Sequence, residues 1–223
     1  MATLLAVIFF IVALALPWYG IAERGTYSLP GSNTTSEGDL ISSFYWTGFV
    51  IYINPKDGSD STEEYSWNDL KEISGKSSNR PQTVYFACMA LAGVSLVLSI
   101  LVSCFIFCCL MRRSARRSLE ESCGNCPKWS IFLASLLSFL TAVASWGALF
   151  AFPTALDDID FLKCKGEYWC GSFVGSKDIG SDSNLYWAPS IGWVFAVMAS
   201  VWGLIGCALA LLVPKTHQYT LIN

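Results

Sequence analysis

The sequence predicts a membrane protein that is mainly α-helical, with a bundle of four transmembrane helices and a small extracellular or lumenal antiparallel β-sheet. Hydrophobic residues make up 53% of the 223 residues and charged residues only 14%, whereas about 25% of residues are charged in a typical soluble domain. Four apolar runs without any Asp, Glu, Lys, Arg or His are separated by polar segments, and each is treated as one span of a single domain. The expected spans are about 2–22, 83–111, 129–153 and 189–213.

The segment 112–128 orients the chain in the membrane. It carries five basic residues against two acidic ones, while the segments 23–82 and 154–188 are both acidic. Because Lys and Arg are retained on the cytoplasmic side during insertion, we expect 112–128 and the tail 215–223 to be cytoplasmic. The segments 23–82 and 154–188 are then the two outer loops.

The first apolar run spans the membrane only if its helix continues past Pro17 to Ala22, because a span of about 20 residues is needed to cross the hydrocarbon core. With four spans, both termini are cytoplasmic. The alternative is a cleaved signal peptide, since Ala13-Leu14-Ala15 resembles an A-x-A cleavage site, although no basic residue precedes the apolar run.

The first outer loop is predicted to supply the sheet. Its segment 43–53 is rich in aromatic and β-branched residues and is typical of a strand, and 54–58 has turn chemistry. Weaker strand candidates are 64–70 and 26–29. Asn33 begins an Asn-Thr-Thr glycosylation sequon, which can be used only on the outer side, although such triplets also occur by chance.

The second outer loop contains Cys164 and Cys170, which are the only cysteines expected outside the membrane and the cytoplasm. We expect them to form a disulfide in an oxidising compartment. Asp157, Asp158 and Asp160 form an acidic group that could bind calcium, but without EF-hand spacing a solvated acidic loop is the favoured interpretation.

Small residues recur at a spacing of four in two spans: Ala134, Ser138 and Ala142, then Ala199, Gly203 and Cys207. Such stripes let helices approach closely. We expect them to pack inside the monomer, and a homodimer interface is the alternative.

The sequence predicts neither catalysis nor a bound cofactor or metal. The spans contain no ionisable acid or base, which argues against a pump or a proton-coupled transporter. The only histidine is His217, in the tail, so no catalytic arrangement that needs histidine can form in the outer loops. No phosphate-binding loop and no nucleic-acid signature is present.

Four cysteines lie at or beyond the inner end of the second span. Cys108 and Cys109 stand beside arginines, as cysteines that accept palmitate often do. Cys123 and Cys126 form a CxxC pair, which is half a zinc site. Reduced, unmodified thiols are the remaining interpretation of all four.

The tail contains Tyr219-Thr-Leu-Ile222, which matches a Tyr-x-x-apolar sorting pattern read by clathrin adaptors. An extended tail can add a strand to the adaptor while the Tyr219 and Ile222 side chains fill two pockets. This predicts residence in the plasma membrane, in endosomes and lysosomes, or in both. A tail without function is the alternative, because so loose a pattern also arises by chance.

The layout of four spans, a long first outer loop, a short basic inner loop and a shorter second outer loop resembles the claudin and peripheral myelin protein superfamily. In that family the first outer loop carries a W…GLW…C…C signature. Tyr45-Trp46-Thr47-Gly48-Phe49 stands at the corresponding place, and this loop contains no cysteine. The resemblance implies a non-enzymatic protein of membrane organisation or adhesion, or an auxiliary subunit of a channel or transporter.

Exposed aromatic residues are favoured contact residues, so Tyr45, Trp46, Phe49 and Trp67 are candidate partner contacts. The alternative is that these rings form the core of the small sheet. The expected partners are the lipid bilayer and other membrane proteins, or further copies of the chain.

Overall fold

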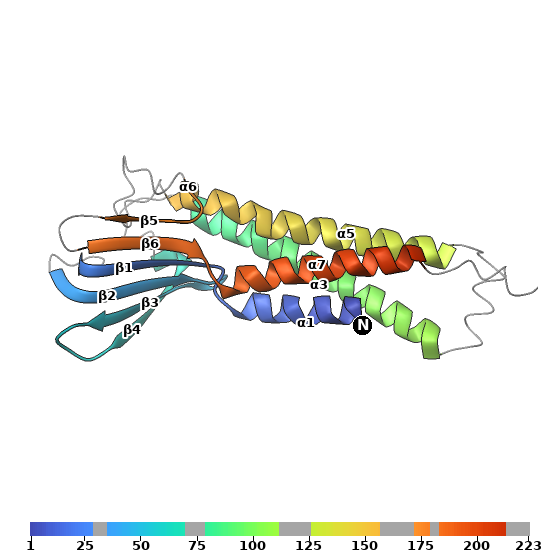
Figure 1. Ribbon diagram of the computed structural model, residues 1–223, viewed down its shortest axis with the longest axis horizontal. Coiled ribbons are helices and arrows are strands. Elements are labelled where there is room, and N and C mark those ends of the chain that lie inside the picture. Colours follow the sequence, from blue (N-terminus) through green and yellow to red (C-terminus); the bar gives the residue numbers. More distant parts are fainter. Residues whose placement is uncertain (29–34, 70–78, 112–125, 157–171, 179–182, 213–223) are drawn as a thin grey trace, which may run out of the picture.

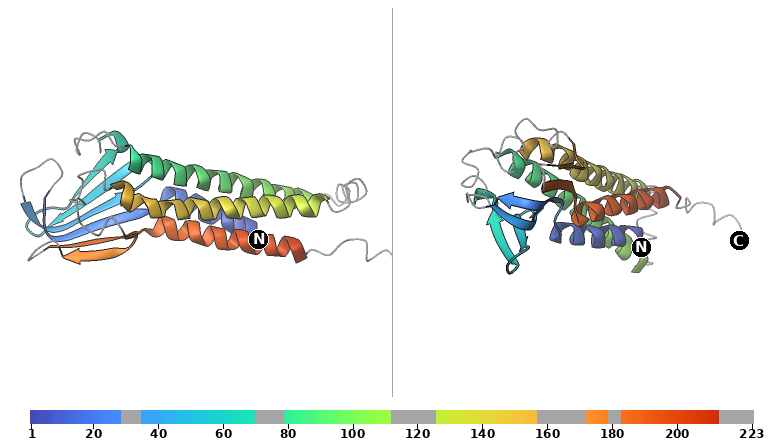
Figure 2. Two further views of the ribbon diagram at one scale, coloured as in Figure 1. Left: turned by 90° about the horizontal axis from the view of Figure 1, so that it is seen from above. Right: turned by 60° about the vertical axis from the view of Figure 1, so that its left-hand side comes forward.

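The computed structural model describes residues 1–28, 35–69, 79–111, 126–156, 172–178 and 183–212. These residues form a helical bundle with one antiparallel β-sheet at its end (Figure 1). Helices and strands run roughly along the same long axis, so the sheet extends the bundle lengthwise (Figure 2). The prediction of a helical bundle that carries an antiparallel sheet is confirmed at this level.

Three helices in the described part of the chain are long and apolar enough to cross a membrane. They are α3 (Arg80–Met111), α5 (Cys126–Ala148) and α7 (Ile191–Leu212). A short 3₁₀ turn, η1 (Leu149–Ala151), and α6 (Phe152–Leu156) extend α5 toward the sheet. Most large apolar side chains on these helices are exposed in the isolated chain, which is compatible with a membrane protein whose helices are covered by lipid.

The expected first span, 2–22, is wrong in its extent. Helix α1 covers Ala2–Ala15, which corresponds to about 21 Å of helix, against a hydrocarbon core of about 30 Å. Leu16 is extended, with φ −107° and ψ 158°, as expected for a residue that precedes a proline. Pro17 therefore ends the helix, and the next residues enter the sheet instead of completing a fourth span.

Helix α1 packs along α7, and a glycine at each end of the contact allows the close approach. A Cβ on Gly192 would lie 2.7 Å from the Pro17 carbonyl oxygen, and one on Gly206 would lie 3.3 Å from Thr3. Beyond Gly206, α7 continues for six further residues to Leu212, so α1 stops about 9 Å short of its end. Figure 1 shows both α3 and α7 extending past the N-terminus of α1.

Helices α3 and α5 are joined by a seam of buried serines. The Ser95 hydroxyl donates to the Ser138 carbonyl at 2.7 Å, and the hydroxyls of Ser99 and Ser138 lie 2.8 Å apart. Nearer the sheet, the Ser145 hydroxyl donates to the Cys88 carbonyl at 2.7 Å. Interhelical hydrogen bonds between such small side chains hold membrane helices at close distance.

The sheet has six antiparallel strands in the order β4-β3-β2-β1-β6-β5. The first four come from one polar segment: β1 (Tyr19–Ser28), β2 (Thr35–Phe44), β3 (Gly48–Pro55) and β4 (Ser61–Ser66). The other two, β5 (Gly175–Asp178) and β6 (Ser183–Pro189), precede α7. Both polar segments thus build one sheet, because β6 pairs with β1.

The strand boundaries differ from the expected ones in the first polar segment. The expected strand 43–53 is a hairpin, because β2 ends at Phe44 and β3 begins at Gly48. Tyr45 donates its N–H to the Gly48 carbonyl at 2.8 Å and closes the turn between them. Of the expected strand 64–70, only 64–66 belong to β4 (Ser61–Ser66), and 67–69 are helical. Of the expected turn 54–58, residues 54 and 55 are the end of β3, and 56–58 form the turn.

Candidate interaction surface

Five aromatic side chains from separate parts of the chain join the sheet to the bundle. This junction cluster consists of Tyr19, Phe44, Trp67, Tyr85 and Phe152. The ring of Phe152 lies 5.2–6.5 Å, centroid to centroid, from those of the other four. All four of these contacts are edge-to-face, which is a favourable geometry for aromatic pairs.

Hydrogen bonds fix the same junction. The carbonyl of Phe44, the last residue of β2, accepts from the Trp18 N–H at 3.0 Å and from the Tyr85 hydroxyl of α3. The Trp18 carbonyl accepts from the Ser190 N–H at 2.9 Å, just before α7. These hydrogen bonds hold β2, the start of β1, α3 and α7 together at one level. The sheet is therefore a rigid extension of the helices.

The two faces of the sheet differ in exposure. Trp187, Ile21, Ser42 and Ile51 lie side by side on β6, β1, β2 and β3, and all four are buried. The neighbouring row on the opposite face consists of Tyr186, Ala22, Ile41 and Tyr52. Tyr186 is 43% exposed and the other three are partly exposed.

We name this row the open face. It presents two tyrosine rings at its ends with the smaller Ala22 and Ile41 between them. Beside it, Arg24 pairs with Asp39 at 3.8 Å and places its guanidinium 5.8 Å from the centre of the Tyr186 ring. Tyrosines and an arginine on a rigid, partly exposed surface are the residue types favoured in protein–protein contacts.

Two tyrosine side chains of the neighbouring strands β3 and β4 pair with carboxylates. The Tyr52 hydroxyl donates to Asp60 at 2.6 Å, and the Tyr65 hydroxyl donates to Glu63. The bond to Glu63 raises the pKa of Tyr65 to about 12, and the bond to Asp60 also raises the pKa of Tyr52. Both hydroxyls therefore keep their proton to a higher pH than an ordinary tyrosine does.

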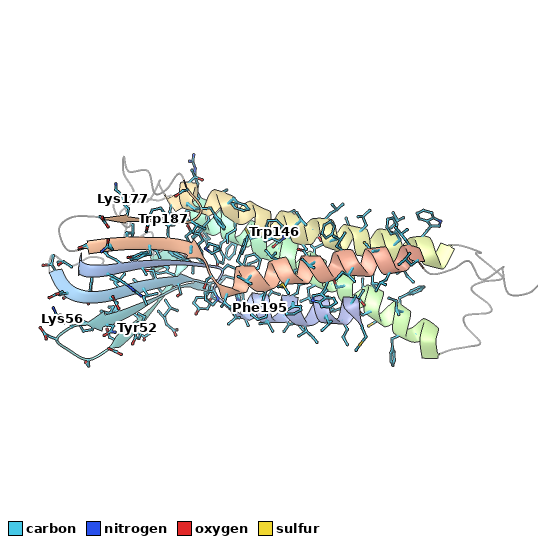
Figure 3. The ribbon with its side chains drawn as sticks, viewed as in Figure 1. Tyr52, Lys56, Trp146, Lys177, Trp187 and Phe195 are labelled. Carbon is cyan, nitrogen blue, oxygen red and sulfur yellow. The ribbon has the colours of Figure 1, made fainter. Side chains whose placement is uncertain are left out.

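Figure 3 shows Lys56 at the distal end of the sheet and Trp187 nearer the helices. The Lys56 ammonium lies 2.7 Å from the Glu37 carboxylate, and this partner raises the lysine pKa. Because both side chains are largely exposed, the pair adds little stability, but it marks the distal turn as water-facing.

The four predicted contact residues lie close together but in different environments. Phe49 and Trp67 are buried, Tyr45 is partly exposed, and Trp46 is 52% exposed. Phe49 stacks on Tyr65 across β3 and β4, and Trp67 belongs to the junction cluster. In this fold only Tyr45 and Trp46 of the four can meet a partner without rearrangement.

Both stripes of small residues lie largely inside the bundle. Ser138 and Ala142 of α5 are buried and Ala134 is partly exposed. Ala199 and Cys207 of α7 are buried, and Gly203 faces Phe139 of α5. The stripes therefore serve packing between helices of one chain.

Several predicted modification and signal residues lie outside the described residues. They are Asn33, the pair Cys164 and Cys170, the acidic group 157–160, Cys123, and the tail with Tyr219 and Ile222. Cys108 is exposed near the end of α3, while nothing is described of the side chains of Cys109 and Cys126. Within the described ranges, no group of three His, Cys, Asp or Glu residues is arranged to hold a metal.

The open face was missed in the sequence, although its signal is present. Apolar residues alternate along β3, with Phe49, Ile51 and Ile53 on the buried face and Tyr52 on the other. The same alternation around Tyr186 marks β6. In a strand, alternate residues lie on opposite faces. Applying this two-residue period to each segment would have assigned Tyr52 and Tyr186 to the face opposite the buried residues.

Comparison of the chain with models of known protein families gives no match, and comparison with curated proteins gives none either.

Proposed function

We propose that the chain is a non-enzymatic membrane protein that organises or joins membranes through the open face of its outer sheet. The observation that carries this proposal is the row of Tyr186, Ala22, Ile41 and Tyr52, which is partly exposed on a sheet anchored to the helices. A rigid surface with aromatic anchors loses little conformational entropy when it binds. The order of a long first polar segment, a short basic segment and a shorter second polar segment, which resembles that of claudins, supports the same role.

In the proposed topology the sheet lies outside and 112–125 lies in the cytoplasm. The basic composition of that segment and the acidic composition of the sheet support this orientation. A glycan on Asn33 and a disulfide between Cys164 and Cys170 are proposed for the same outer side, and S-acylation at Cys108 or Cys109 for the inner side.

The test of the adhesive role is clustering of suspended cells that express the protein. Wild-type cells are expected to cluster, and the double variant Tyr52→Ser/Tyr186→Ser is expected to reduce clustering strongly at equal surface level. Val174→Ala, an exposed apolar residue just before β5, is the matched control and should have no effect. Clustering that is absent in wild type, or unchanged in the double variant, argues against this role for the open face.

An auxiliary subunit of a channel or transporter is the second candidate. Leu133, Leu137 and Leu140 form an outward row on α5, each more than half exposed, which suits packing against a partner helix as well as lipid. Purification in mild detergent separates the candidates. A stoichiometric, unrelated membrane protein supports the subunit role, whereas self-oligomers alone support the first candidate.

The tail is proposed to direct cycling between the plasma membrane and endosomes or lysosomes through clathrin adaptors. The motif Tyr219-Thr-Leu-Ile222 supports this destination. Tyr219→Ala is expected to raise the surface fraction severalfold, as measured by surface biotinylation, with His217→Ala as a nearby control. If the surface and internal pools do not change in Tyr219→Ala, the tail is not a sorting signal.

A further inference from the structure

We propose that the turn between β2 and β3, residues 45–47, is seated in the phospholipid headgroup layer and that Trp46 is its lipid contact. The partner is the lipid surface of the protein's own membrane. The position of the sheet relative to the bilayer is then the same whether the protein acts in adhesion or as an auxiliary subunit of a channel or transporter.

The turn holds Trp46 outward while its backbone is fixed. Tyr45 and Gly48 close the turn at 2.8 Å, and the Trp46 carbonyl accepts from the indole N–H of Trp67 at 3.0 Å. Trp67 itself is buried in the junction cluster. The Trp46 side chain is nevertheless 52% exposed, so a large aromatic ring projects from a rigid backbone.

The turn lies at the level where the helices meet the sheet. Phe44, two residues before Trp46, contacts the Phe152 ring and accepts the hydrogen bond from Tyr85 of α3. On α3, Phe86 follows Tyr85 and is itself 46% exposed. The exposed apolar side chains of α3 therefore begin at about the level of the turn.

The length of the apolar region places this level at a membrane boundary. Cys108 follows Tyr85 by 23 residues on α3, and Phe152 follows Trp129 by 23 residues along α5, η1 and α6. Either distance is about 35 Å, slightly more than a hydrocarbon core of about 30 Å. None of the described residues between these levels is Asp, Glu, Lys, Arg or His.

A second exposed tryptophan marks the opposite boundary. Trp129, at the far end of α5, is 54% exposed. Tryptophan is enriched at both membrane–water interfaces because its ring is apolar and its indole N–H can bond to headgroups or water. Trp46 and Trp129 thus fit the two aromatic belts of one bilayer. Because the two exposed tryptophans lie about one membrane thickness apart along the helices, we favour lipid over a protein partner at Trp46.

The test uses fluorescence of the purified full chain in phosphatidylcholine bilayers. The Trp46 emission is taken as the difference between wild type and Trp46→Phe, and Trp46→Tyr should give the same difference. Bilayers with acyl chains brominated near the headgroup are compared with unbrominated bilayers, and iodide is added separately as a quencher in water. Trp129→Phe provides the matched measurement at the other boundary.

The Trp46 emission is expected to fall by at least about twofold with the shallow bromines and to change little with iodide, as should that of Trp129. Emission of Trp46 that is insensitive to bromine but quenched by iodide overturns the proposal. That outcome would place the turn in water, where a protein partner could reach it.

Discussion

Phe152→Ala is expected to lower the free energy of unfolding by about 3–5 kcal/mol, the usual cost of removing a buried aromatic ring. Phe152 is fully buried and contacts four rings that come from β1, β2, α3 and the segment after β4. Its loss leaves a cavity where the sheet joins the helices. We therefore expect the sheet to loosen while the helices remain paired.

The measurement is thermal unfolding of the protein in one detergent, followed by tryptophan fluorescence for the junction and by far-ultraviolet circular dichroism for the helices. The fluorescence midpoint should fall clearly in Phe152→Ala while the helical signal at low temperature is retained. Phe107→Ala is the control, because that ring is 62% exposed on α3 and should be covered by detergent. Equal fluorescence midpoints in the two variants would contradict the role given to Phe152.

Gly48→Ala is expected to break the pairing of β3 with β4. A Cβ at Gly48 would overlap the carbonyl oxygen of Tyr65 and lie 3.0 Å from the Ser66 Cα. Both contacts are with backbone atoms of the neighbouring strand, so no side chain can move aside. The strands must separate there, which disrupts the Phe49–Tyr65 stack and the position of Trp67.

Hydrogen exchange measures this effect. Amides of β4 are expected to exchange much faster in Gly48→Ala, while those of α7 are unchanged. Gly93→Ala is the matched control, because a Cβ at Gly93 meets nothing within 4 Å, and alanine is favoured over glycine in a helix by about 1 kcal/mol. Unchanged protection of β4 in Gly48→Ala would show that the strands tolerate the methyl group.

The helices were largely predictable from the sequence, because α3, α5 and α7 are long apolar runs and such runs are a strong signal. The first run shows where this signal fails. The sequence remains free of charged residues through Trp18 to Ala22, but α1 ends before Leu16-Pro17, and β1 begins at Tyr19. Local proline chemistry, and not hydropathy, decides that boundary.

The sheet was only partly predictable. Residues 43–53 form one continuous aromatic-rich run, so the turn between β2 and β3 within it could not be recognised from composition. The pairing of β1 with β6 joins segments about 160 residues apart in the sequence. Local patterns do not encode such pairing. The same limit applies to the contact residues, because Trp46 and Trp67 are the same residue type, yet the turn exposes one and the junction cluster buries the other.

The most direct test of the account is the side of the membrane on which the sheet lies. An epitope inserted in the turn after β3, beside the exposed residues Asp57 and Gly58, extends from the distal end of the sheet and should leave the junction intact. A second variant carries the same epitope within 112–125. On intact cells the antibody is expected to bind the first variant only, with the second stained after permeabilisation. Staining of the second variant on intact cells, or of the first only after permeabilisation in cells with a verified surface pool, would contradict an outer sheet and the role proposed for it.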